Sequence, residues 1–519
     1  MRMTAKSLLL STTAVILALT LGGCNKQSPM RYSQQMINAR MTAWYNKDNC
    51  VGFPNANSTN GITMPENMAT WDYVPGVVAK GILDVWQYYQ DSAWADAWYI
   101  GLAQWADQLD EEELNELVRG GILDDLNCAK VFMGLYEGAK PGGKFENAER
   151  AAYYMQQMQR ASRGLAEHAA KYSIHTGIGG DGETLEPEVE GGWMHKATDN
   201  PEKSYWGQMW CDGAYMGPAL LAQLLQYGAC EGTGLGWNDV VKQFTASWPY
   251  LWDEEKQLPY HVLFTDVTVN KNARAIHDSG HAFLCNQPSA ISHQQSPIPN
   301  QFLVYHSEEY WGRAAGWYIL ALVDVMEAYM KGLSDEAQST NELPQAANFE
   351  TLHEYLTKLA NGLIARQDKA TGCWYQLLQY GAEKCATQGI DDTGSNKYTN
   401  VAEGGTQCNY LESSASCLIT AALLKATRLG LGDYAEAGKR GFEGIQKQFI
   451  QTTPSLSREG WGEVSITSSC QSAGLSHDRN GSAAYYLIGK DVPIQDNTEG
   501  KVLGAYLMAA VEYERACQR

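Results

Sequence analysis

The sequence of 519 residues predicts an all-α fold, an (α/α)6 barrel of six helical hairpins with long loops at its mouth. Two observations predict this fold. Apolar residues recur with the period of a helix along most of the chain, which suggests roughly a dozen helices. Short clusters of aromatic, acidic and glycine residues also precede several long apolar helices. If the helices alternate between an outer and an inner ring, the inner ones bring these clusters to one mouth.

Helical spacing is clearest in the apolar stripes of residues 78–89, 356–363 and 418–423. Gly430 and Gly432 follow the third stripe, as is typical of a helix C-terminus. Further helical patterns begin near Gln34, Ala93, Asn127, Asn147, Asp212, Trp237, Ala314, Tyr434 and Lys501. Strand-like alternation is scarce, as at residues 463–466. Residues 265–305 and 377–407 lack a helical pattern, and we expect them to be mouth loops that shape specificity.

The clusters before the helices lie at residues 71–73, 123–125, 210–213, 311–313 and 410–412. Capping and turn chemistry explains any one of them. Because there are five, and each contains a charged group, together they favour a functional site. Helix N-termini carry partial positive charge, so such a site suits an anionic ligand.

Residues 1–24 are typical of an export signal rather than of a folded domain. Arg2 and Lys6 precede an apolar run at residues 8–21 that is short for a membrane span. The sequence Leu-Gly-Gly-Cys that ends at Cys24 resembles the lipobox of bacterial lipoproteins. We therefore expect a lipid anchor on Cys24, localisation in the periplasm or at the cell surface, and one catalytic domain over residues 30–519. The alternative is an ordinary secretory signal in which Cys24 is incidental.

The chain contains 12 cysteines, and export would place them where disulfides persist. Without Cys24 their number is odd, so at least one remains unpaired within the chain. Cys385 could pair with either Cys373 or Cys408 to close one loop. Cys211 and Cys417 lie in apolar helical stretches and are better explained as small buried residues. No cysteine or histidine group has the spacing of a zinc site, and we expect neither metal nor cofactor.

The formal net charge of −20 makes nucleic acid an improbable partner and argues against a long basic groove. A pocket for one terminal acidic sugar needs only one or two cationic side chains. The 16 Trp and 29 Tyr suit stacking on sugar rings, although a large helical core explains them equally well.

Asp212 stands out because its neighbours in sequence are apolar. Such surroundings favour a protonated carboxyl group, which a general acid requires. From this stretch alone, however, a helix-capping role is the better explanation. Asp124 and Asp125 could serve a metal, acid–base chemistry or solvation, and one of the two is expected to face solvent. His195, His261 and His306 are candidates for hydrogen bonds to sugar or water.

The order of motifs resembles glycoside hydrolase family 105, the unsaturated rhamnogalacturonyl hydrolases, and the related family 88 unsaturated glucuronyl hydrolases. The stretches around Asp212 (Trp-Cys-Asp-Gly-Ala-Tyr-Met) and Arg313 (Trp-Gly-Arg-Ala-Ala-Gly-Trp) carry most of this resemblance. Weaker matches run in family order from Trp71 to the C-terminus. They lie at residues 71–76, 123–127, 193–196, 259–261, 372–376, 410–415 and 481–486.

The resemblance implies a metal-free (α/α)6 barrel that removes a terminal 4,5-unsaturated uronic acid from pectin-type oligosaccharides made by lyases. It places Asp212 on the general acid/base and Asp124 on the second active-site aspartate. Sugar-contacting positions fall on His195, Met216, His261, Arg313 and Trp317, and less closely on Tyr73 and Trp374.

The spacings from His195 to Asp212 and from His261 to Trp311 are longer than the family pattern, which leaves the leaving sugar open. Two other functions compete with the hydrolase. One is a non-catalytic glycan-binding lipoprotein, and the other is a polysaccharide lyase on a similar helical barrel.

Overall fold

The computed structural model describes most of the chain after residue 72 and one helix before it. The described residues are 30–41, 73–107, 109, 111–112, 114–115, 122–175, 189–197, 205–265, 276–285, 304–334, 346–391, 399–453, 463–476, 479–496, 498 and 500–517. The predicted export signal and Cys24 lie outside them, as do much of the predicted mouth loop at residues 265–305 and residues 392–398 of the loop at 377–407.

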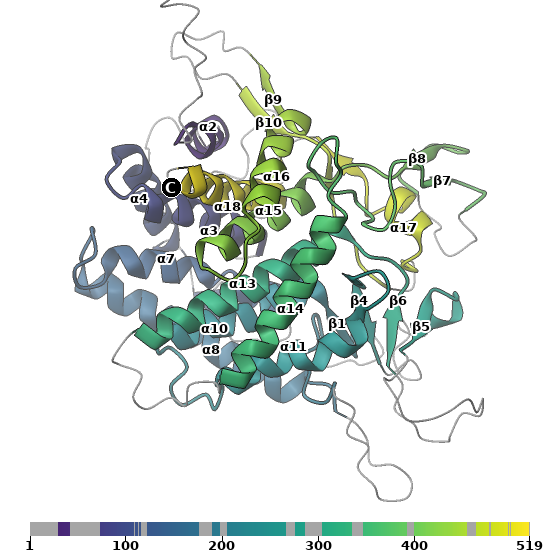
Figure 1. Cartoon of the computed structure of the whole chain (residues 1–519). Helices are drawn as coiled ribbons and strands as arrows, with labels where there is room; N and C mark the ends of the chain where they lie inside the picture. The colour runs from purple at the N-terminus through teal and green to yellow at the C-terminus, as the bar shows by residue number, and fades with distance from the viewer. Residues whose placement is uncertain are drawn as a thin grey trace, which may run out of the picture.

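Six helices form a closed inner ring in which each helix packs against the next, and the last against the first (Figure 1). In ring order they are α3 (Tyr73–Tyr88), α7 (Lys130–Ala139), α10 (Pro218–Gln226), α13 (Gly312–Ser334), α15 (Ser413–Arg428) and α18 (Gly500–Cys517). Their apolar stripes make up much of the hydrophobic core.

Six further helices surround this ring, and each packs against at least one inner helix. They are α2 (Met30–Met41), α4 (Ala93–Ala106), α8 (Ala148–Lys171), α11 (Trp237–Leu251), α14 (Ala346–Ala365) and α16 (Ala435–Gln448). Outer and inner helices alternate along the sequence. The predicted (α/α)6 barrel is therefore confirmed.

The ring closes where α3 meets α18, and two glycines allow the close approach. A Cβ atom on Gly81 would lie 2.9 Å from the carbonyl oxygen of Gly504. A Cβ on Gly504 would lie 2.5 Å from the side chain of Val77. Any larger residue at either position would push the two helices apart.

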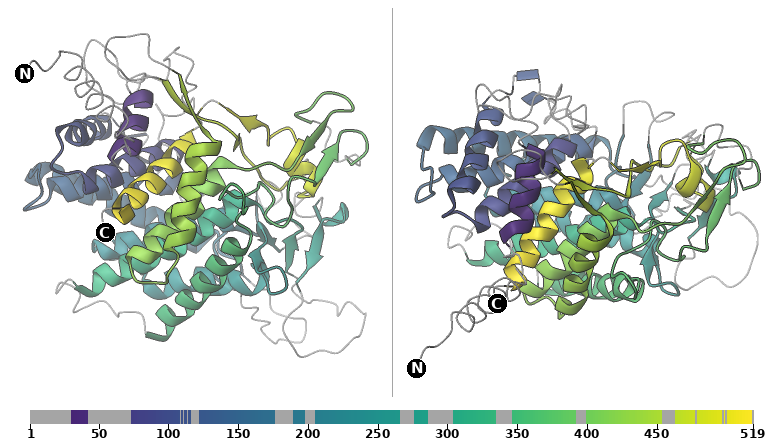
Figure 2. Two further views of the ribbon diagram at one scale, coloured as in Figure 1. Left: turned by 45° about the horizontal axis from the view of Figure 1, so that its top comes forward. Right: turned by 90° about the horizontal axis from the view of Figure 1, so that it is seen from above.

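Short strands and helices gather at one side of the barrel (Figure 2). The strands β1 (Gln208–Trp210), β4 (Val262–Phe264), β6 (Tyr305–Ser307) and β5 (Ala282–Leu284) form an antiparallel sheet in that order. Two-stranded pairs join β2 (Trp252–Asp253) to β3 (Leu258–Pro259), β7 (Cys385–Thr387) to β8 (Thr406–Cys408), β9 (Ile450–Thr453) to β10 (Glu463–Ile466), and β11 (Ser469–Cys470) to β12 (Ile494–Gln495). The short helices are α6 (Leu123–Asn127), α9 (Cys211–Met216) and α17 (Ala483–Ile488). The sequence pattern predicted only β10, because strands this short show almost no alternation.

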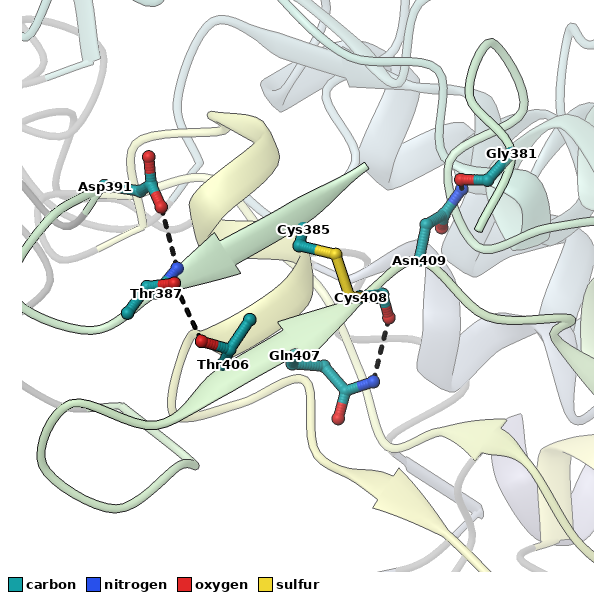
Figure 3. Close-up of a disulfide and its surroundings, with 8 residues drawn as sticks. All are labelled: Gly381, Cys385, Thr387, Asp391, Thr406, Gln407, Cys408 and Asn409. Atoms are coloured by element: carbon teal, nitrogen blue, oxygen red, sulfur yellow. Dashed lines mark hydrogen bonds between the residues drawn. A yellow bond between two sulfur atoms is a disulfide. The ribbon is translucent and has the colours of Figure 1, made fainter. Parts of the chain in front are cut away.

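A disulfide joins β7 to β8 within one of the expected mouth loops (Figure 3). It pairs Cys385 with Cys408, whose Cα atoms are 3.8 Å apart. Cys373 is buried and unpaired, which excludes the alternative pairing. Cys211 and Cys417 are buried free thiols, as expected. Beside the disulfide, the hydroxyl groups of Thr387 and Thr406 also bond across the two strands.

Of the helices that the structure describes, none combines the length and apolar character needed to cross a bilayer.

Candidate active site

A cavity of about 140 Å³ opens at the end of the barrel where the inner helices begin. It is smaller than the roughly 300–1,000 Å³ of typical small-molecule sites, which suits one sugar unit rather than a chain. Its walls contain two carboxyl groups, four cationic side chains and five aromatic rings. They are Tyr73, Asp124, His195, Lys196, Tyr205, Trp210, Asp212, Met216, Trp311, Arg313, Trp317, Ser472, Ala473, Arg479 and Lys501.

Backbone pairing between short segments brings the acidic and histidine side chains together. Ile122 pairs with Lys196, just before Asp124. The amide of His195 donates to the carbonyl of Gln208 in β1, over 2.9 Å. The amide of Cys211 donates to the carbonyl of His261, over 3.1 Å. Segments far apart in sequence therefore meet as one small scaffold, from which α6 and α9 each begin with an aspartate in the first turn.

Asp124 is buried and held by a cation. Its Oδ2 lies 2.5 Å from Nζ of Lys196, and its Oδ1 lies 3.3 Å from Nε2 of His195. Burial alone would raise the pKa of Asp124, but the charge of Lys196, followed by that of His195, outweighs burial and lowers it below its ordinary value. Asp124 is therefore an ionised, paired carboxylate at neutral pH. Its neighbour Asp125 is only half-buried, as expected for one member of the pair.

Asp212 has a different environment from Asp124, although both line the same cavity. Its side chain is 12% exposed, and its Oδ2 lies 3.2 Å from Nε2 of His261. No Lys or Arg among the described residues forms an ion pair with it, and Oδ2 is buried without a hydrogen bond. A carboxyl group without a fixed cation is free to exchange a proton with a substrate.

His195 contacts Asp124 and stacks on the ring of Trp210, with centroids 5.1 Å apart. Burial lowers the pKa of His195, against the opposing pull of Asp124. The imidazole is therefore neutral at pH 7 and available for hydrogen bonding. Its Nδ1 is buried without a hydrogen-bond partner.

The other residues predicted to contact sugar divide into those that line the cavity and those that do not. Tyr73, Met216, Arg313 and Trp317 line it. Arg313 is also anchored to the protein. Its Nε donates to Ser414 Oγ over 2.6 Å, and its Nη2 bonds the carbonyl of Cys470 and Ser469 Oγ. Glu412, which caps α15, lies 3.6 Å from the same guanidinium group.

Two of the predicted sugar-contacting residues lie elsewhere. His261 is fully buried behind Asp212 and does not line the cavity, because it fills the space between the rings of Trp210 and Trp311. Trp374 is fully buried in the core, where its Nε1 donates to the carbonyl of Leu363 over 2.7 Å. The expectation for Trp374 was therefore wrong. His306 stacks on Tyr260 in the mouth sheet and also lies outside the cavity lining.

The sequence did not single out three cations of the wall, namely Lys196, Arg479 and Lys501. Burial opposes the charged form of Lys196, but Asp124 raises the pKa of Lys196 above its ordinary value. Arg479 is oriented by Asp491 at 2.7 Å and by the hydroxyl of Tyr205 at 3.2 Å. Lys196 directly follows His195 in one of the motifs that resemble the family, and this position was the one sequence signal that it could lie in the site. We see no sequence pattern that would have identified Arg479 or Lys501.

Metal binding has no support in the described part of the chain, where no group of three or more His, Cys, Asp or Glu side chains is arranged as a metal site.

The fold and the pocket together define a helical-barrel glycoside hydrolase. Within this class the chain belongs to Glycosyl Hydrolase Family 88, whose sequence pattern matches residues 49–178, 303–390 and 391–517. The match omits residues 179–302, which carry His195, Asp212 and His261. The grouping of those three residues therefore rests on the structure.

Two curated proteins share part of the sequence. Protein Atu3128 of Agrobacterium fabrum is 29% identical over 208 residues, which is 39% of this chain and 70% of that protein. The 24.9 kDa protein in the picA locus of Rhizobium radiobacter matches to the same extent, with 29% identity over 208 residues.

Solved structures share the fold. A family 105 glycoside hydrolase from C. acetobutylicum superposes with a TM-score of 0.56 at 22% identity, covering 93% of this chain and 99% of that one. A possible family 105 member from Salmonella enterica gives 0.51 at 17% identity, covering 94% and 93%. The unsaturated glucuronyl hydrolase from Streptococcus agalactiae gives 0.50 at 12% identity, covering 94% and 92%. The recognition of families 105 and 88 from sequence motifs is thus confirmed.

Proposed function

We propose that the enzyme removes the terminal 4,5-unsaturated uronic acid from oligosaccharides that a polysaccharide lyase has produced, with pectin-type rhamnogalacturonan fragments as the first substrates to test. The observation that carries this proposal is the contrast between the two carboxyl groups of one small cavity. Asp124 is paired with Lys196, whereas Asp212 has no Lys or Arg partner among the described residues and contacts only the imidazole of His261. One group is thus fixed as an anion, and the other is available for proton transfer.

The unsaturated uronide is an enol ether, and its chemistry suits this arrangement. In the proposed reaction Asp212 donates a proton to C4, and the positive charge that develops at C5 is shared with the ring oxygen. Water then adds at C5 and returns a proton to Asp212. The resulting hemiketal opens and releases the neighbouring sugar. The glycosidic bond is lost after hydration, so the usual rule that relates carboxylate separation to stereochemistry does not apply.

The remaining side chains of the cavity provide the binding functions that this reaction needs. Asp124, fixed as an anion, accepts hydrogen bonds from sugar hydroxyl groups. Lys501 and Arg479 bring positive charge to a substrate that carries a carboxylate. Trp317 offers a ring face for stacking on the sugar. One structural relative, from Streptococcus agalactiae, is an unsaturated glucuronyl hydrolase by name, which supports the same substrate class.

Ultraviolet absorbance of the unsaturated uronide tests the proposal and separates its rivals. A hydrolase removes the absorbance, a lyase generates it from intact polymer, and a binding protein leaves it unchanged. Asp212→Asn should bind substrate and unfold at the wild-type temperature, but should lose about 10³-fold in kcat. Near wild-type loss of absorbance by this variant would contradict the assignment. A panel of lyase products with different second sugars then identifies the leaving group.

We further propose that Cys24 carries a lipid that anchors the enzyme to a membrane, with the catalytic domain in the periplasm or at the cell surface. The support is the sequence that ends at Cys24. Cells that express the full chain should hold the enzyme in the membrane fraction, and Cys24→Ser should move it to the soluble fraction. Wild-type protein found only in the soluble fraction contradicts the anchor.

A further inference from the structure

A buried tyrosine is linked to Asp212 through His261. The hydroxyl of Tyr486, on α17, lies 2.6 Å from Nδ1 of His261. The other ring nitrogen, Nε2, lies 3.2 Å from Oδ2 of Asp212. Tyr486 and His261 are both fully buried, and neither lines the cavity. Neither side chain has a role in the reaction as described so far.

The imidazole ring of His261 is held in one orientation. Its amide donates to the carbonyl of Glu309, and its carbonyl accepts from the amide of Cys211. The ring packs between Trp210 and Trp311, with centroid distances of 4.9 and 4.7 Å. Because the ring is confined in this way, the main variable left is which nitrogen carries the proton.

The hydrogen bond from Tyr486 decides this question. Burial raises the pKa of Tyr486 well above its ordinary value, so the phenol keeps its proton. Within the described residues, Nδ1 of His261 is the only hydrogen-bond partner of this hydroxyl group, so Nδ1 accepts. An imidazole whose Nδ1 accepts a hydrogen bond carries its proton on Nε2. The N–H group of His261 therefore faces Asp212.

We infer that Tyr486 is a positioning residue that holds His261 in the Nε2–H tautomer, so that the transferable proton of Asp212 resides on Oδ1. A proton on Oδ2 would be crowded by the proton on Nε2, because the two heavy atoms are only 3.2 Å apart. Oδ2 is itself buried, so the 12% of the side chain that remains exposed lies away from it. Proton delivery to a substrate in the cavity therefore uses Oδ1.

Nε2 and Oδ2 lie within hydrogen-bonding distance, but the N–H direction is not aligned with the oxygen, and both atoms lack a hydrogen bond. Catalytic hydrogen bonds are commonly loose without substrate and tighten when it binds. On this basis we expect the hydrogen bond from Nε2–H of His261 to Oδ2 to form as Asp212 gives up its proton. The tautomer is independent of the substrate, whereas the role of Oδ1 rests on the proposed function.

Neutron diffraction from crystals of the deuterated wild-type enzyme tests the tautomer directly. Deuterium is expected on Nε2 of His261 and on the hydroxyl of Tyr486, with none on Nδ1. Deuterium on Nδ1 overturns the inference, whatever the activity of the enzyme. This measurement needs no variant and so does not depend on a mutant that folds.

Kinetics of Tyr486→Phe test the consequence for catalysis. Loss of the hydroxyl frees the tautomer of His261, so kcat on an unsaturated disaccharide should fall about 10- to 100-fold while KM stays within about twofold. The matched control is Tyr154→Phe, which removes the hydroxyl of an equally buried tyrosine on the outer helix α8 and should leave both constants unchanged. Wild-type kcat in Tyr486→Phe contradicts the inference.

The two proposals fail in different ways. A wild-type enzyme that consumes no unsaturated uronide overturns the proposed function, and the neutron result still decides the tautomer. An active enzyme whose kcat is indifferent to Tyr486→Phe overturns only the role of Tyr486.

Discussion

The two ends of the barrel differ in how their buried charged side chains are paired. At the end where the inner helices begin, the cavity of about 140 Å³ holds the proposed active site. At the opposite end lies a larger cavity of about 250 Å³, to which all six inner helices contribute. Its walls carry six cationic and four acidic side chains. These are Lys80, Lys130, Lys331, Lys425, Arg428, Arg515, Asp84, Asp324, Glu327 and Glu512.

The far-end charges are largely satisfied by one another. Nζ of Lys425 lies 2.6 Å from both Asp324 and Glu327. Arg428 bonds Glu512 through two nitrogens, each at 2.8 Å from a carboxylate oxygen. Cations also suit this end because the C-termini of the inner helices carry partial negative charge. A buried network of this kind keeps its geometry only if its members stay paired.

The near end leaves four polar atoms in or directly behind the cavity wall without hydrogen-bond partners. Asp124 Oδ1, His195 Nδ1, Asp212 Oδ2 and His261 Nε2 are all buried there without a hydrogen bond. Such atoms are rare in folded proteins and call for a functional explanation. Among the described residues that line the far cavity there are two comparable atoms, Oδ2 of Asp324 and Nε of Arg515. Polar atoms without partners are therefore more numerous at the end that holds the proposed active site, and paired charges are more numerous at the other end.

A layer of packed side chains separates the two cavities. Nζ of Lys130, in the far wall, donates to the carbonyl of Tyr215 over 2.7 Å and lies 3.3 Å from the centre of its ring. The ring of Tyr215 packs against Trp317, which lines the near cavity, with centroids 4.6 Å apart. Because this layer is packed from both sides, a change at one end need not disturb the geometry of the other.

The largest effect is expected at the far end, from Asp324→Asn. Asp324 lies among Lys425, Lys80 and Lys130, and these cations, led by Lys425, lower its pKa despite its burial. Removing its charge leaves buried cations under-compensated, which costs about 3–5 kcal/mol in the free energy of unfolding. Urea unfolding measures this loss, and kcat of the folded enzyme at 20 °C should stay within about twofold. A variant with normal stability and reduced kcat would show that the far cavity takes part in function.

The sequence predicted the barrel because the evidence for it is local and repeated. Helical spacing and terminal glycines are properties of single segments, and all nine predicted helix starts lie at or within a few residues of observed helices. The motifs likewise identified side chains that line the cavity. These are Tyr73, His195, Asp212, Met216, Arg313 and Trp317.

What the sequence could not supply depends on contacts between distant segments. Arg479 and Lys501 reach the cavity from the last part of the chain, and nothing in their own neighbourhoods marks them. Trp374 was misplaced because a motif shows that a tryptophan is present and not which way its ring points. The network around Asp324 was not foreseen either, because its charged members lie on five different helices and look like ordinary helix charges.

The same substitution at the near end, Asp124→Asn, should have a smaller effect and the opposite pattern. Activity should fall about 10²-fold, because the variant loses the anion that binds sugar hydroxyls. Stability at pH 7 should fall by less than about 1 kcal/mol, because Lys196, with 35% of its side chain exposed, can turn to water once its partner is gone. Steady-state kinetics and thermal unfolding measure the two effects.

The pH dependence of Asp124→Asn sharpens the comparison further. The pKa of Asp124 is lowered in the folded state, so its contribution to stability is present above the ordinary aspartate pKa and is lost as the pH falls through the lowered value. Asparagine cannot titrate, so the variant should lose less stability than the wild type on acidification below about pH 4. Thermal unfolding from pH 3 to pH 7 measures the difference. If the variant and the wild type lose the same stability between pH 7 and pH 3, Asp124 is not held as an anion in the folded protein. Asp124 would then not be a paired charge, and the contrast with Asp212 would be lost.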